Sequence, residues 1–153
     1  MTDRNAEAYC GLYCGACPVL LKREQDVIYR AVREHWSAST EDLDCLGCRS
    51  EVLSVSCRDC PKRDCAQARG LDSCATCPEM PCDKLTFRLP HAAEIVPNLT
   101  ALRDHGPSVW LEQQEAKWRC PSCGRMGSWY ERSCPDCGAM LPAGHEPPSE
   151  VFS

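Results

Sequence analysis

Residues 120–138 read CPSCGRMGSWYERSCPDCG, so the unit C-P-x-C-G occurs at both ends of this stretch. Two residues between cysteines let a tight turn direct both sulfurs at one cation, with a zinc–sulfur distance of about 2.3 Å. Glycine after each second cysteine, at Gly124 and Gly138, permits the tight turn that points backbone amides at the sulfurs. Four thiolates with no open position predict a closed structural zinc site. Its ligands are Cys120, Cys123, Cys134 and Cys137.

The segment between the two units, residues 125–133, is short and aromatic and suits a small hairpin. Together with it, residues 119–141 resemble the zinc-ribbon and rubredoxin-like knuckle family. The resemblance implies a small module built around one metal ion. A four-cysteine iron site of the rubredoxin type has the same spacing and stays open as the alternative. Zinc is favoured because it is the commoner occupant of such sites.

Cysteine is the unusual component of the whole chain, with 15 cysteines among 153 residues. An odd number cannot pair completely within one chain. The polar start, MTDRNAE, is followed by no apolar run, so we expect no export signal, no membrane span and a cytoplasmic location. Structural disulfides are rare in that reducing compartment, and six C-x2-C pairs favour metal ligation over a redox dithiol. The pairs are Cys14/Cys17, Cys45/Cys48, Cys57/Cys60, Cys74/Cys77, Cys120/Cys123 and Cys134/Cys137.

Residues 10–82 hold the other cysteines and contain an internal repeat. Residues 57–65, CRDCPKRDC, and residues 74–82, CATCPEMPC, both follow C-x2-C-P-x3-C. A proline after the second thiolate fixes the direction in which the chain leaves. These thiolates fill two four-ligand sites with three left over, or three sites with one further ligand, so we expect about three to four zinc ions in all. They are Cys10, Cys14, Cys17, Cys45, Cys48, Cys57, Cys60, Cys65, Cys74, Cys77 and Cys82.

The sequence leaves open which of these cysteines share a site. Taken in fours along the chain, they form the sets Cys45/Cys48/Cys57/Cys60 and Cys65/Cys74/Cys77/Cys82, and leave Cys10/Cys14/Cys17. Metal ligands commonly interleave, which allows a rival grouping. That grouping joins Cys14/Cys17 to Cys45/Cys48, and Cys57/Cys60 to Cys74/Cys77.

The triplet Cys10, Cys14 and Cys17 has the C-x3-C-x2-C spacing of radical S-adenosylmethionine enzymes, in which one iron of the cluster stays open. Those enzymes need most of a barrel, about 200 residues or more, so the length disfavours that chemistry. An iron–sulfur cluster without it remains the alternative to zinc in the N-terminal region. A distant histidine is the candidate further ligand, from among His35, His91, His105 and His145. His91 lies nearest the cysteine cluster, nine residues past Cys82, although a surface or capping role is favoured for it.

Hydrophobic residues make up 43% of the chain, but only about a third remain once cysteines are set aside. The core is therefore thin, and bound metal is expected to hold the fold. Apolar periodicity predicts one helix from Pro18 to about Trp36, and further short helices over 83–90, 98–106 and 108–118. The expected fold is a small metal-stabilised α+β protein with three to four short helices: a cysteine-rich domain over 8–118, a zinc-ribbon knuckle over 119–141 and a flexible tail over 142–153.

Several spaced motifs resemble, in order, a prokaryotic cysteine-rich family catalogued as domain of unknown function 3795. They are CGLYCGACP at 10–18, the CLGCR knuckle at 45–49, and RGLDSCATCPEMPCDKL at 69–85. The resemblance covers about residues 8–118. It implies a small metal-binding domain with no assigned reaction, and it supplies no catalytic residues.

The formal net charge is −5, and thiolate-bound zinc makes it more negative. Nucleic-acid binding relies on cations that neutralise phosphates, so a protein is the expected partner. The best basic group, Arg58, Lys62, Arg63 and Arg69, is interleaved with cysteines and is expected to stabilise metal-bound sulfur. No catalytic grouping is recognised, so we expect a structural or interaction module and not an enzyme. Iron–sulfur electron transfer, and Cu(I) storage or thiol redox sensing, are the alternatives.

Overall fold

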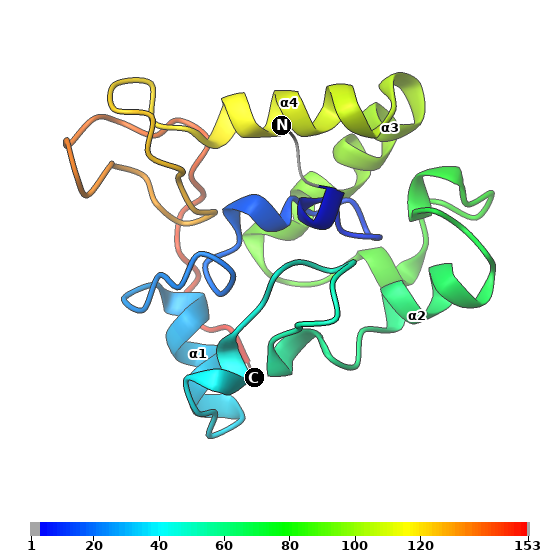
Figure 1. The fold of residues 1–153 in the computed structure, drawn as a ribbon, viewed down its shortest axis with the longest axis horizontal. Helices are drawn as coiled ribbons and strands as arrows, with labels where there is room; N and C mark the ends of the chain where they lie inside the picture. Colours follow the sequence, from blue (N-terminus) through cyan, green and yellow to red (C-terminus); the bar gives the residue numbers. More distant parts are fainter. Residues whose placement is uncertain (1–3, 153) are drawn as a thin grey trace.

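The computed structural model of the chain describes residues 4–152. These residues form four α-helices: α1 (Val27–His35), α2 (Pro61–Ala68), α3 (Ile95–His105) and α4 (Pro107–Trp118). Most of the remaining chain is loop, with short segments of 3-10 helix between the loops (Figure 1). These segments are Arg4–Ala6, Cys14–Ala16, Glu41–Leu43, Val55–Cys57, Cys74–Thr76, Asp83–Leu85 and Pro90–Glu94.

The first long helix is shorter than the sequence predicts. Residues 18–26 form turns, in which Lys22 has a φ of 55° and the Arg23 amide donates to the carbonyl of Pro18 at 2.9 Å. Helix α1 begins only after Asp26, whose carboxylate accepts a hydrogen bond from the Ile28 amide at 2.8 Å. An aspartate in this capping position satisfies an amide that otherwise has no helical partner, and so fixes the start of the helix. The prediction of a helix from Pro18 was therefore wrong at its N-terminal half.

Helices α3 and α4 form a hairpin that carries much of the core. The chain turns between them at Gly106, with a φ of 84°, and Pro107 occupies the first turn of α4. Ile95, Leu99 and Trp110 are fully buried. In Figure 1 the N-terminal segment passes beside this hairpin, and the Asn98 side chain, which lies inside α3, donates to the carbonyl of Gly11 at 2.9 Å. The hairpin thus supports the segment that contains the first three cysteines.

Strand structure is almost absent from residues 4–152. The bridges are isolated ones, between Glu7 and Tyr13, Arg119 and Met126, and Ser133 and Met140. The last two each close one C-P-x-C-G unit on itself, so residues 125–133 do not pair as a hairpin. The expected helix number is confirmed for the described residues, whereas the α+β class is not.

The C-terminal module packs against the cysteine-rich domain through aromatic side chains. Trp129 stacks on His91, with 4.2 Å between the ring centroids, and the Trp129 amide donates to the carbonyl of Ala16 at 3.0 Å. The Tyr130 hydroxyl lies 2.7 Å from Nδ1 of His91. These contacts make Trp129 and Tyr130 part of the main packed core, and Figure 1 shows the loops over 120–140 at one end of the molecule.

Residues 142–152, for which the sequence predicts a flexible tail, run back along the protein. Nε2 of His145 lies 2.6 Å from a carboxylate oxygen of Glu94, and Phe152 stacks on His35 beside α1 with 4.1 Å between the centroids. Figure 1 shows the chain end next to α1. Within the described range, every helix is too short or too polar to span a bilayer.

Candidate metal centres

The four C-terminal cysteines form a compact group. Sγ of Cys120 lies 3.5 Å from Sγ of Cys137, and Sγ of Cys123 lies 3.6 Å from Sγ of Cys134. All four sulfurs lie within 4.8 Å of one another. Tetrahedral zinc with bonds of about 2.3 Å requires sulfur–sulfur separations of about 3.8 Å. The sulfur positions therefore fit one tetrahedral ion, as the spacing in the sequence predicts.

Each C-P-x-C-G unit is a tight turn with the same hydrogen bonds. The Gly124 amide donates to the carbonyl of Cys120 at 2.9 Å, and the Gly138 amide donates to that of Cys134 at 2.8 Å. Both glycines have a φ of 78°, which confirms the need for glycine after the second cysteine. The backbone amide of Cys123, followed by that of Ser122 and by the neighbouring thiols of Cys137 and Cys123, lowers the pKa of Cys120, whereas the thiols of Cys134, Cys120 and Cys137 raise the pKa of Cys123. The turn amides therefore favour a thiolate, the form that binds metal, at Cys120.

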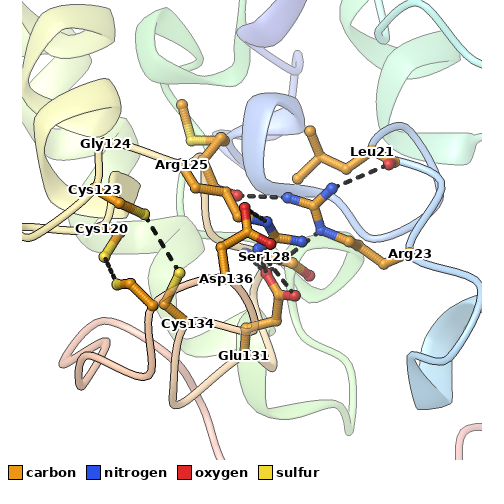
Figure 2. A network of polar contacts seen from close by, with 12 residues as sticks. Leu21, Arg23, Cys120, Cys123, Gly124, Arg125, Ser128, Glu131, Cys134 and Asp136 are labelled. Carbon is orange, nitrogen blue, oxygen red and sulfur yellow. Dashed lines mark hydrogen bonds and ion pairs between the residues drawn. The ribbon is translucent and has the colours of Figure 1, made fainter.

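A partly buried ionic network, with Asp136 at its exposed edge, lies behind these turns (Figure 2). Arg23 donates to the carbonyl of Met126 at 2.5 Å, and its guanidinium lies 3.4 Å from Glu131. Arg125 contacts the same carboxylate at 3.1 Å and Asp136 at 3.5 Å. Since Arg125 follows the first turn and Asp136 lies inside the second, this network ties the two turns to each other and to the loop before α1.

Seven of the other cysteines line one cavity of about 200 Å³, which we call the cysteine chamber. Its walls are mostly apolar and include Leu12, Leu20, Leu53 and Trp129. The chamber brings the triplet Cys10/Cys14/Cys17 together with the set Cys45/Cys48/Cys57/Cys60. It therefore includes cysteines that the grouping in fours separates and that the rival grouping joins only in part. The cysteines are Cys10, Cys14, Cys17, Cys45, Cys48, Cys57 and Cys60.

The remaining four cysteines line a second cavity of about 110 Å³, which we call the small cavity. These four are the second set of the grouping in fours. The rival grouping, which joins Cys57/Cys60 to Cys74/Cys77, does not describe this cavity. Helix α2 separates the two cavities, and Lys62 in its first turn lines both. Helix α2 is not among the helices predicted from the sequence, although Pro61 is well suited to the first helical position. The cysteines are Cys65, Cys74, Cys77 and Cys82.

Thiols in both cavities are held in a setting that opposes their ionisation when no cation is present. Burial, followed by the proximity of Cys48 and Cys60, raises the pKa of Cys10 to about 12. Burial and then the neighbouring Cys57 and Cys45 raise that of Cys17 to about 12. Burial together with the other three cysteines of the small cavity raises the pKa of Cys74 to about 11. Such crowded buried thiols become thiolates readily only when a bound cation offsets their charge.

Backbone amides nevertheless point at several of these sulfurs. The amides of Val19 and Leu20 donate to Cys17, and that of Leu12 donates to Cys10. The Gly47 amide donates to Sγ of Cys45 at 3.4 Å. Amide donors around sulfur are typical of metal-bound thiolates, because they stabilise the negative charge on the ligand. The loops are thus built to hold sulfur anions.

The basic residues of this region have different roles. Arg69 donates to Sγ of Cys77 at 3.8 Å, and Lys62 lines both cavities. Arg63 is buried and donates to the carbonyls of Cys57 and Arg58, each at 2.7 Å. Arg58 itself pairs with Asp42 at 3.4 Å. Arg69 is therefore the one of the four for which a sulfur contact is seen, while Arg63 holds the backbone at Cys57 and Arg58.

The comparison with protein families matches residues 6–87 to a family described as "Protein of unknown function (DUF3795)". The chain belongs to this family. No curated protein and no solved structure matches the chain. The DUF3795 segment contains the cysteines of both cavities, whereas the C-terminal four-cysteine site lies outside it. The cysteines of the chamber and the small cavity thus belong to the DUF3795 region, while Trp129 of the C-terminal module completes the chamber wall.

The histidine considered as a further ligand lies outside the cavities of the DUF3795 region. His91 is buried between Trp129 and Tyr130, and burial, followed by the charges of His145 and Lys62, lowers its pKa to about 3. His91 therefore packs as a neutral ring among aromatic side chains. This role differs from both roles considered from the sequence, a metal ligand and a surface or capping residue. Among residues 4–152, the side chains that line the chamber and the small cavity include no histidine.

A surface groove of about 690 Å³ lies between α1 and the C-terminal module. Its lining mixes both signs of charge, with Arg23 and Arg125 already paired to Glu131. No cysteine lines the groove, so the candidate metal ligands lie elsewhere, in the two smaller cavities and at the C-terminal turns.

Proposed function

We propose that this chain is a small multi-site metal-binding protein that acts as a structural and interaction module, with a zinc ion in the C-terminal site. The sulfur separations of 3.5 and 3.6 Å carry the proposal for zinc. They match a single tetrahedral ion held by four thiolates, which leaves no position for substrate. This arrangement supports a structural role for the C-terminal metal.

The energetic argument also favours a structural role. A structural zinc contributes roughly 10–16 kcal/mol of apparent free energy in small zinc domains. Whole domains are stable by only about 5–15 kcal/mol. The C-terminal module has a core cluster of just Cys120, Cys134 and Leu141, with Ala139 beside it, apart from the aromatic residues that join the main core. Bound metal is therefore the main contribution available to order these turns.

A protein is the class of partner that we propose. The net charge is −5 before any thiolate is counted, and this opposes binding to phosphate backbones. Two exposed apolar side chains in or beside metal-binding turns, Leu46 and Met140, support contact with another protein. Fluorescence anisotropy with single- and double-stranded DNA and RNA at low salt tests the charge argument. We expect no binding, and salt-dependent binding of any of them contradicts a protein-only partner.

The zinc assignment is tested by metal analysis of matched variants. Cys123→Ser removes one thiolate, and Ser122→Ala changes the exposed neighbour that offers no side-chain ligand to the site. We expect Cys123→Ser to lose one zinc per chain relative to the unchanged protein, and Ser122→Ala to keep it. An unchanged zinc content and melting temperature in Cys123→Ser would contradict the proposal.

A further inference from the structure

The two ends of the chain present their sulfurs differently. The C-terminal cysteines are nearly in contact, at 3.5 and 3.6 Å. Among residues 4–152 they are also the one group of three or more cysteine, histidine or acidic side chains whose ligand atoms all lie within 4.8 Å. The cysteines of the chamber and the small cavity face common spaces, but they do not approach one another in this way. Their sulfurs are therefore less tightly grouped than those of the C-terminal site.

The spaces themselves are also larger than a single ion fills. An ordered water needs only about 10–15 Å³ of cavity. The chamber has about 200 Å³ and the small cavity about 110 Å³. In an iron–sulfur cluster each thiolate binds a different iron, or shares one with a single other thiolate, and the inorganic core fills the space between the ligands. A ring of separated thiols around an apolar space has the shape that such a core requires.

The surroundings of the sulfurs fit the same cofactor. The sulfurs of Cys10, Cys17 and Cys45 accept hydrogen bonds from backbone amides. Arg69 donates to Cys77, and Lys62 lies between the two cavities. Hydrogen bonds to sulfur and nearby positive charge stabilise an anionic cluster and set its potential. Such donors offset the negative charge of a cluster, and the lining of the chamber is mostly apolar.

We propose that both cavities of the DUF3795 region hold iron–sulfur clusters: a four-thiolate cluster in the small cavity and at least one cluster in the cysteine chamber. The inference rests on the proposed metal-binding function and deepens it, because it assigns the class of cofactor for the N-terminal cysteines. The seven sulfurs of the chamber exceed the four that one cluster needs, and its volume is nearly twice that of the small cavity. The C-terminal site remains a zinc site in the same chain.

The test is anaerobic purification of the full chain from cells supplied with iron, cysteine and zinc, followed by metal and acid-labile sulfide analysis. We expect iron and sulfide in about equal amounts, as in [4Fe–4S] and [2Fe–2S] clusters, together with one zinc per chain. Broad absorbance in the visible range, and an electron paramagnetic resonance signal after dithionite reduction, are expected on the unchanged protein. A protein that contains zinc without sulfide overturns the inference, but leaves the metal-binding function standing. A natively folded protein without any metal overturns both.

Paired variants assign the clusters to their cavities. Cys74→Ser with Cys77→Ser removes half the sulfurs of the small cavity, and Cys45→Ser with Cys48→Ser removes two from the chamber. We expect each pair to lose part of the iron and sulfide and to keep the zinc. The matched control, Cys134→Ser with Cys137→Ser, is expected to lose zinc and keep iron. Iron and sulfide that stay unchanged in both N-terminal pairs contradict the assignment, and the spectra of the unchanged protein test it independently if a variant fails to fold.

Discussion

The carboxylate of Glu7, only 1% exposed, lies 3.2 Å from the guanidinium of Arg49, and the same guanidinium donates to the Glu7 carbonyl at 2.8 Å. Arg49 also donates to the carbonyl of Asp72 at 2.7 Å and stacks over the ring of Tyr9. Arg49 follows Cys48 directly, so this one side chain joins three segments of the chain. They are the segment of Glu7 before Cys10, the segment after Cys48, and the segment of Asp72 before Cys74.

Removal of either member of this pair is expected to destabilise the protein strongly. Arg49→Ala leaves the buried Glu7 carboxylate with only Arg4, so we expect a loss of about 3–5 kcal/mol in the free energy of unfolding. The matched control is Arg103→Ala, whose ion pair with Asp104 is exposed on both sides. There the expected loss is below about 1 kcal/mol. Denaturant unfolding of both variants checks the difference, and equal losses would contradict a joining role for Arg49.

Trp129 is expected to dominate the attachment of the C-terminal module. It is buried, stacks on His91 and forms part of the wall of the cysteine chamber. Trp129→Ala is therefore expected to cost about 3–5 kcal/mol, as large-to-small changes in a core do. Met140→Ala changes a side chain that is 80% exposed and should cost less than about 0.5 kcal/mol. Thermal melts followed by circular dichroism measure both, and a Trp129→Ala melt like that of the control would rule out this attachment.

His91 gives the fold a dependence on pH. Its pKa is lowered from 6.5 to about 3 in the folded protein, because burial disfavours the charged ring. The folded protein favours the neutral ring of His91. The contribution of His91 to the free energy of unfolding is therefore fully present above pH 6.5 and is lost as the pH falls from 6.5 towards 3. His91→Phe keeps an aromatic ring against Trp129 and removes the titration. Stability measured from pH 7 to pH 4.5 should therefore fall less steeply for His91→Phe than for the unchanged protein. Parallel pH profiles would disprove the assignment.

The left-handed glycine of each metal-binding turn can be tested without steric interference. A Cβ at Gly124 would meet no atom within 4 Å, so its φ of 78° is the sole cost of a side chain there. Gly124→Ala should destabilise the turn by about 1–2 kcal/mol. If the zinc site and the turn form together, this loss lowers the affinity for zinc by about 5- to 30-fold. Gly124→Asn is the matched control, because asparagine tolerates this backbone region better. Competition with a zinc chelator measures both affinities, and an alanine variant that binds zinc as tightly as the asparagine variant would argue against the turn's role.

Local features could be predicted from the sequence, and contacts between distant segments could not. The C-terminal site follows from spacing and glycine alone, because both act within one turn of the chain. The start of α1 was misplaced because apolar periodicity continues through 18–26, whereas the Asp26 cap and the turn at Lys22 decide the boundary. The seven-cysteine chamber depends on Arg49 and on the α3–α4 hairpin, which bring residues far apart in sequence together. Nothing in the spacing of the cysteines reveals those contacts.

The most direct test of the whole account is removal of metal from the unchanged, anaerobically purified protein with a strong chelator. Elemental analysis and far-ultraviolet circular dichroism are recorded on the same sample. Bound metal at the cysteine sites is expected to hold the fold, so the helical signal and the cooperative melt should disappear as metal is lost, and zinc should restore the C-terminal module. A metal-free protein that keeps its helical signal and its melting temperature would contradict the account.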